Sequence, residues 1–190
     1  MKKVVLILAL FSVLNGFSQT RESLKTRASK LFEATNALDM ETVLALTYNK
    51  AFGNADRAIV LESMKAAVNN DYMSIEFTNP KPQPFTMDEI KTINGKKFSV
   101  IRYRNSLVLH LKQTLEPTVI KAMSDGMKSA GNYASVTYDD KTNSFFIDGN
   151  GIMVAVADDS TKNEWEFVNY DNKDLFNVVF NENIKKSLGL

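Results

Sequence analysis

The segment Phe98–Lys112 limits the possible folds more than any other part of the 190-residue sequence. Apolar and polar side chains alternate along it, and this period is typical of a β-strand whose two faces have different surroundings. We expect the odd-numbered row to face the core and the mostly polar even-numbered row to face solvent. The odd-numbered row is Ile101, Tyr103, Asn105, Leu107, Leu109 and Leu111. Because a strand of this length needs partners, the segment predicts a sheet.

Turn signals around this segment predict antiparallel neighbours. Asn94-Gly95 is a strong hairpin signal and joins a predicted strand at Thr86–Ile93 to a long strand at Lys96–Lys112. An earlier strand is predicted at Tyr72–Thr78, before a proline-rich loop. A turn at Gly149-Asn150 is expected among the later strands. Those strands are predicted at Tyr133–Tyr138, Ser144–Asp148, Gly151–Ala157 and Glu164–Tyr170.

Helical periodicity occupies both ends of the chain and one internal segment. Apolar residues recur at three- and four-residue steps in Thr20–Leu38, Asp39 can cap the helix that follows, and Ala55–Val68 forms a third. Leu115–Ala130 is predicted to be helical, and one final helix is expected after Asp171. The pattern indicates an α+β fold with N-terminal helices packed on an antiparallel sheet.

The first 18 residues have the features of an export signal. Lys2 and Lys3 precede an apolar run, and Gly16 and Ser18 are small residues where a signal peptidase reads the chain. The run is shorter than the roughly 20 apolar residues that a membrane span needs. We therefore predict cleavage after Ser18, a single domain at 19–190, and a periplasmic or extracellular location without a stable membrane anchor. An uncleaved N-terminal anchor is the alternative.

Charge and cysteine content exclude several classes of protein. Without Lys2 and Lys3, 21 of the 23 basic residues remain against 22 acidic ones, a net charge near −1, which argues against nucleic acid as a partner. The absence of cysteine excludes disulfides, thiolate nucleophiles and Cys-containing metal sites. Such a chain depends on its hydrophobic core for stability.

Two stretches resemble a known superfamily. They are Ala37-Leu38-Asp39-Met40-Glu41-Thr42-Val43-Leu44-Ala45-Leu46 and Glu164-Trp165-Glu166-Phe167-Val168. The chain looks like the nuclear-transport-factor-2-like, or SnoaL-like, superfamily, and within it like uncharacterised exported proteins of Bacteroidota. The resemblance implies a curved sheet wrapped around a long helix, a cone with an internal pocket. That superfamily contains isomerases, cyclases, dehydratases and many non-catalytic binders. The helix near 115–130 and the C-terminal helix depart from its plainest version.

The sequence offers few groups for catalysis. His110 is the single histidine, so a His-rich metal site is impossible, and we expect it to be a solvated strand residue rather than a catalytic base. No GxSxG motif and no Gly-rich phosphate loop occur, so neither a serine hydrolase nor a bound cofactor is predicted. Adjacent acids such as Asp139-Asp140 and Asp158-Asp159 are expected to be solvated turn residues.

The best candidates for a binding site lie on the core-facing rows. Tyr103 and Asn105 are polar residues there, and burial without partners would cost about 1–3 kcal/mol each. They either form internal hydrogen bonds or line a pocket, and Trp165 is the third candidate. Arg102 and Arg104 point outward, toward an anionic partner or toward acids on the next strand. We expect an exported, non-catalytic module that binds a small apolar ligand or an envelope protein. The alternative is an isomerase or dehydratase that uses a pocket carboxylate and Tyr103.

Overall fold

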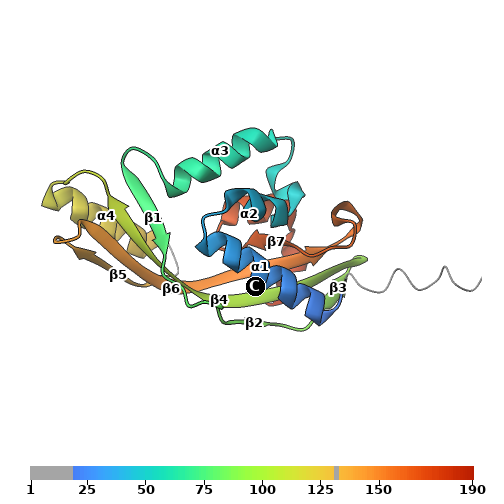
Figure 1. The fold of residues 1–190 in the computed structure, drawn as a ribbon. Coiled ribbons are helices and arrows are strands. Elements are labelled where there is room, and N and C mark those ends of the chain that lie inside the picture. Colours follow the sequence, from blue (N-terminus) through green and yellow to red (C-terminus); the bar gives the residue numbers. More distant parts are fainter. Residues whose placement is uncertain (1–18, 131–132) are drawn as a thin grey trace, which may run out of the picture.

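The computed structural model describes residues 19–130 and 133–190, so the predicted signal segment 1–18 lies outside the described residues. Helices and short 3-10 turns flank a sheet in which long strands form the centre (Figure 1). The helices and 3-10 turns are α1 (Arg21–Asn36), α2 (Met40–Leu46), η1 (Asn49–Phe52), α3 (Arg57–Val68), α4 (Pro117–Ala130), η2 (Asp159–Thr161), α5 (Lys173–Val179) and α6 (Glu182–Leu188). The strands are β1 (Met73–Phe77), β2 (Phe85–Met87), β3 (Lys91–Ile93), β4 (Lys96–Leu111), β5 (Tyr133–Asp139), β6 (Ser144–Ala157) and β7 (Glu166–Asn169).

The sheet is built on the long antiparallel pair β4 and β6, which stay in register from Lys97 opposite Ala157 to His110 opposite Ser144. Strands β1, β2 and β3 pair with the other edge of β4, and β5 and β7 pair with the other edge of β6. Every one of these pairings is antiparallel, and the described strands do not close into a barrel. The predicted α+β class with an antiparallel sheet is therefore confirmed.

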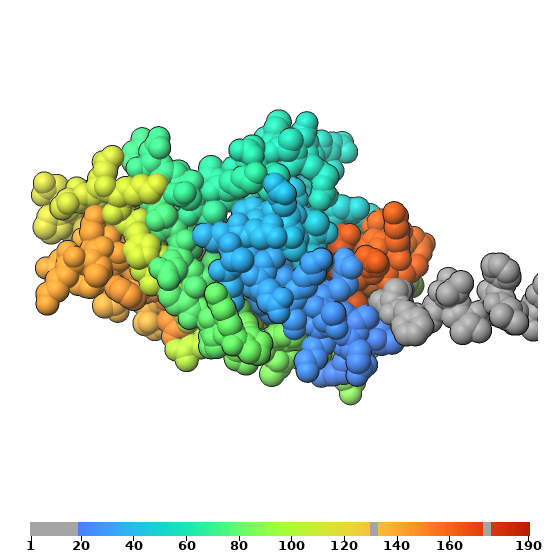
Figure 2. Space-filling model, in the orientation of Figure 1, coloured from blue at the N-terminus to red at the C-terminus, as the bar shows by residue number. Residues whose placement is uncertain are grey.

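Local capping explains where the first helices begin. The Thr20 hydroxyl accepts a hydrogen bond from the Ser23 N–H in a capping box, and the Asp39 carboxylate accepts one from the Thr42 N–H at 3.1 Å, as predicted for the second helix. In Figure 2 these N-terminal helices, coloured blue to cyan, cover the centre of the visible face. They bury their apolar stripe on the sheet beneath.

One sheet face carries α1 and α4 at opposite ends (Figure 1). Under α1, Ile101 belongs to a cluster with helix residues such as Leu24 and with Trp165, and at the other end Leu109 packs with α4 residues such as Met123. The odd-numbered row of β4 thus faces the core, as predicted. Its members are 0% exposed at Ile101 and 9% exposed at Leu109.

The even-numbered row is also partly covered, so its predicted exposure is wrong at three positions. Phe98 and Val100 are buried against α5 and α6, through residues that include Phe176. Val108 is 5% exposed, and its cross-strand neighbours are Glu76 and Phe146. A periodic pattern in one strand does not show which part of its second face another helix will cover.

Three predicted element boundaries are wrong. The segments Ser144–Asp148 and Gly151–Ala157 form the single strand β6, because Gly149 and Asn150 continue the ladder with β4 instead of turning. The strand predicted at Thr86–Ile93 is interrupted between β2 and β3, where Ile90 packs against the α1 cluster. The final helix divides in two, because the Asn181 side chain accepts from the Ile184 N–H and caps α6 separately.

None of the helices within residues 19–130 and 133–190 has the length and apolar character needed to cross a membrane.

Candidate functional site

A cavity of about 340 Å³ lies over the middle of the sheet, between the N-terminal helices and the strands. Its walls come from α1, α2, η1, α3 and β1, and its floor from β4, β6 and β7. Most of the described lining side chains are apolar, and the polar ones are amides or hydroxyls. The apolar ones include Leu31, Phe32, Val43, Phe52, Met64, Phe77, Met153 and Phe167.

Tyr103 forms part of the floor and owes its position to Gly151, its partner on β6. A Cβ atom on that glycine would lie 2.4 Å from the Cζ atom of the tyrosine, so the ring lies directly against the backbone. On its other side, the Phe32 ring centroid is 4.9 Å away. A glycine within a strand often marks this kind of close approach. The tyrosine is thus held between a strand and a helix.

The Tyr103 hydroxyl forms no hydrogen bond with any described residue, although it lines the cavity. Burial raises the pKa of Tyr103 to about 12, with a further contribution from the negative charge of Asp171. The phenol is therefore protonated at neutral pH and can donate a hydrogen bond.

Asn105 lies two residues further along β4 and is held by a chain of amides. The Asn79 side-chain nitrogen donates to Asn36 Oδ1 at 3.0 Å and to Asn105 Oδ1 at 3.4 Å, while Asn79 Oδ1 accepts from the Ser106 N–H at 2.7 Å. The NH₂ group of Asn105 itself has no acceptor among the described residues. Tyr103 and Asn105 thus both line the cavity and both carry a donor that no described residue uses.

The third predicted residue, Trp165, lies elsewhere. It is 0% exposed and belongs to the hydrophobic cluster under α1, where its indole N–H donates to Ser23 Oγ at 3.2 Å. It is not among the described residues that line the cavity. Its role in the structure is to pack and to tie β7 to the first turn of α1.

Two cavity residues that sequence reasoning missed come from the proline-rich loop after β1. Asn79 is 7% exposed and Gln83 is 9% exposed, and the Gln83 amide donates to the Arg104 carbonyl at 2.7 Å. Both line the cavity. The signal available in the sequence is the position of these amides beside prolines, because proline removes a backbone donor and leaves carbonyls and side chains to fix the loop.

No described lining residue of this cavity carries a formal charge. A partly buried carboxyl occurs at Glu166, whose pKa is raised above its ordinary value by desolvation, but its Oε2 accepts from the Asn49 N–H and it is not among the described residues that line the cavity. Asp171 lies near Tyr103, and its Oδ2 accepts from the Ile152 N–H. Among the described lining residues there is thus no carboxyl, imidazole or amino group of the kind that usually transfers a proton.

A serine, histidine and glutamate do meet on the opposite sheet face. His110 Nδ1 lies 2.9 Å from Ser144 Oγ, and its Nε2 lies 3.3 Å from Glu76 Oε2. The serine is 0% exposed and its hydroxyl donates to the Thr142 carbonyl at 2.7 Å, so it accepts from the histidine. A buried hydroxyl that already donates its proton to a carbonyl is not placed to attack a substrate. The three side chains instead link strands β1, β4 and β6.

The two outward arginines have acidic partners. Arg102 binds both oxygens of Asp88 at 2.7 Å, and Arg104 pairs with Asp148 on the neighbouring strand. The Arg104 guanidinium and the Ser106 hydroxyl hold the pKa of Asp148 at about 2. Of the two sequence-based interpretations, pairing with acids of the same chain is the one observed.

Asp158, predicted to be a solvated turn residue, instead forms the most buried ionic group among the described residues, because it caps η2 from inside the fold. Its carboxylate is 4% exposed and accepts from the Tyr48 hydroxyl at 2.8 Å, with the ammonium groups of Lys50 and Lys96 each at 3.4 Å. Burial alone would raise the pKa of Asp158, but hydrogen bonds from Ser160 and Tyr48 and the charge of Lys50 hold it well below its ordinary range. The cluster joins η1, β4 and η2 and is structural.

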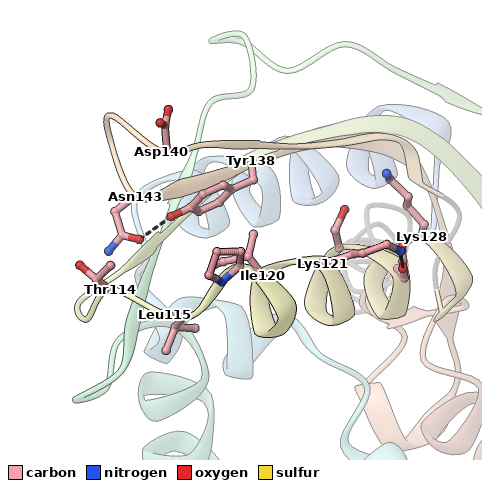
Figure 3. Close-up of a pocket in the computed structure, with 11 residues that line it drawn as sticks. Thr114, Leu115, Ile120, Lys121, Lys128, Tyr138, Asp140 and Asn143 are labelled. Carbon is pink, nitrogen blue, oxygen red and sulfur yellow. Dashed lines mark hydrogen bonds and ion pairs between the residues drawn. The ribbon is translucent and has the colours of Figure 1, made fainter.

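A second hollow is an open groove between α4 and the β5–β6 hairpin (Figure 3). Tyr138 lies on its sheet side and Ile120 on its helix side. Several of its polar groups bond to one another, since the Tyr138 hydroxyl donates to Asn143 Oδ1 at 2.8 Å and Lys121 pairs with Asp125. In the central cavity, by contrast, the Tyr103 hydroxyl and the Asn105 NH₂ group have no partner among the described residues.

The sequence matches no protein-family model and none of the curated proteins compared with it. Among solved structures, the chain is similar to a conserved protein from Planctomyces limnophilus DSM 3776, with 11% sequence identity and a TM-score of 0.39. The match covers 77% of this chain and 88% of that one.

Proposed function

We propose that the protein is a non-catalytic module that binds a small, mostly apolar molecule in the cavity over the centre of the sheet. The observation that carries the proposal is the lining of that cavity, which is apolar except for neutral amides and hydroxyls. This is the usual composition of a small-molecule site, and about 340 Å³ falls near the lower end of the roughly 300–1,000 Å³ typical of such sites.

The enzyme alternative has less support. An isomerase or dehydratase of the expected kind needs a carboxylate in the pocket beside Tyr103, and the described lining residues include none. Binding alone requires only what the cavity contains.

We include in the same proposal that the protein is exported and that its signal segment is cleaved. The basic, apolar and small-residue order of the first 18 residues supports export and cleavage before Gln19. Intact mass of the protein from the cell envelope or culture medium should then correspond to residues 19–190. Full-length chain in the membrane fraction would contradict this part of the proposal.

Kinship with nuclear-transport-factor-2-like proteins remains part of the proposal. It is supported by the order of N-terminal helices followed by an antiparallel sheet and by a cavity between these layers. Within that superfamily, the proposed function corresponds to that of the non-catalytic binding proteins.

A cavity-filling variant tests the proposed binding. Met64 lines the cavity from α3, a helix with no buried residue, so Met64→Trp should occupy cavity volume without disturbing the core. Ile59→Trp is the matched control, because Ile59 is on the same helix and is 67% exposed. With the neutral dye Nile red as probe, we expect fluorescence titration to give at least about tenfold weaker binding for Met64→Trp alone. Equal affinities in all three proteins would refute the proposal.

A further inference from the structure

We propose that the ligand of the central cavity is an uncharged molecule with an acceptor oxygen, such as a ketone, ester or amide carbonyl, attached to an apolar body. The inference rests on the proposed binding function and names the chemical class that the cavity selects. The Tyr103 hydroxyl and the Asn105 amide bind the oxygen-bearing end on the sheet, and the apolar body lies under α1, α2 and α3.

The donors on β4 outnumber the acceptors that the described residues offer them. The Tyr103 hydroxyl and the Asn105 NH₂ have no partner among the described residues, whereas the Asn105 oxygen already accepts from Asn79. The hydroxyl groups of Thr35 and Thr47, which also line the cavity, donate to carbonyl oxygens of their own helices at 2.8 Å. The two unused donors on the strand β4 therefore call for an acceptor on the ligand.

The uncharged lining favours an uncharged ligand. A carboxylate or ammonium moved into this cavity would lose its hydration and gain no counter-ion from the described lining residues. Burying an unpaired charge costs far more than two neutral hydrogen bonds return. Because the high pKa keeps Tyr103 protonated, the phenol donates to a neutral acceptor over the whole physiological pH range.

The two unused donors lie close together in a largely apolar lining. Tyr103 and Asn105 both belong to β4 on the cavity floor, and the side chains around them include the apolar Met153 of β6 and the apolar Phe32 and Met64 of the helices. A ligand that is apolar throughout would leave both donors desolvated, at about 1–3 kcal/mol each. A ligand that is polar throughout would form no hydrogen bonds with the apolar side chains of the walls.

Three naphthalenes of similar shape separate these possibilities. 2-Acetylnaphthalene carries a carbonyl oxygen, 2-ethylnaphthalene lacks it, and 2-naphthoate carries a negative charge. We would measure the Kd of each for the purified protein by ligand-observed NMR, and repeat the series with Tyr103→Phe and Asn105→Leu. Ser124→Ala, in the groove beside α4, is the control variant. Thermal unfolding of each variant identifies any that fails to fold.

We expect 2-acetylnaphthalene to bind at least about tenfold more tightly than either of the others, which corresponds to roughly 1.4 kcal/mol. Each of the two β4 variants should reduce this preference several-fold while leaving 2-ethylnaphthalene binding unchanged, and Ser124→Ala should change neither. Equal affinity for the acetyl and ethyl compounds, or tighter binding of 2-naphthoate, would overturn the inference and leave cavity binding standing. Failure of all three to bind would overturn the proposed function as well.

Discussion

Replacing Gly151 with alanine tests how the cavity floor is built. The added Cβ would lie 2.4 Å from Cζ and 2.7 Å from Oη of Tyr103, well inside van der Waals contact. The ring would have to retreat by about 1 Å to reach an ordinary contact of 3.4 Å. It cannot do so freely, because Phe32 packs against its other side at a centroid distance of 4.9 Å. The substitution therefore either strains this contact or moves the ring into the cavity.

The expected cost follows from overpacking. Inserting a methyl group into a well-packed site typically costs about 1–3 kcal/mol, and the lower backbone entropy of unfolded alanine returns about 0.4–1 kcal/mol. We expect Gly151→Ala to lower the free energy of unfolding by roughly 1–2 kcal/mol, or the Tm by about 2–8 °C for a chain of this size.

Gly126→Ala provides the matched control for urea or thermal unfolding. Gly126 lies within α4 with no atom within 4 Å of the added Cβ, so alanine there should stabilise the protein by about 0.5–1 kcal/mol. In a Tyr103→Leu background, the cost of Gly151→Ala should shrink, because the ring that it meets is gone. The reasoning is refuted if Gly151→Ala stabilises the protein as Gly126→Ala does.

The remaining predictions concern stability elsewhere in the fold. Asp158→Asn should cost about 2 kcal/mol in urea unfolding, because the Tyr48 hydroxyl and two ammonium groups lose a charged partner. The pKa of Asp158 is lower in the folded than in the unfolded chain, so its carboxylate stabilises the fold fully above the unfolded pKa near 3.9, and this stabilisation is lost as the pH falls below that value. Acid should therefore lower the free energy of unfolding less in Asp158→Asn than in the unsubstituted protein. Val108→Asp and Leu109→Asp should both lower the Tm strongly, because their exposed fractions are 5% and 9%; a harmless Val108→Asp would mean that the far sheet face is open there. Amide hydrogens of α3, which has no buried residue, should exchange faster than those of α1, and equal protection would contradict its weak packing.

Much of the architecture could be predicted because it depends on local chemistry. The Thr20–Leu38 periodicity and the Asp39 cap identify α1 and α2 closely, and Asn94-Gly95 places the turn between β3 and β4. These signals act over a few residues, so no knowledge of distant contacts is needed.

The errors arise where a distant residue decides the outcome. Gly149-Asn150-Gly151 has the composition of a turn, yet it continues β6 because Tyr103 needs a glycine opposite its ring. Trp165 shares a strand face with Phe167, but only the position of α1 shows that it is packed away from the cavity. Asn79 becomes a cavity residue through a contact with Asn105 that no sequence period reveals.

The arrangement of helical layers explains why the core-facing row of β4 contains polar residues at all. At one end α1 and α2 cover Ile101, and at the other end α4 covers Leu109, both on the same face of the sheet. Between these two layers the cavity lies over the sheet, and there the row reads Tyr103, which packs on Phe32 of α1, and Asn105. An apolar residue at these positions would be the default for a strand that only packs. The interruption of the apolar row therefore coincides with the cavity, which is why the donors of Tyr103 and Asn105 are the ones that a ligand of the proposed kind would use.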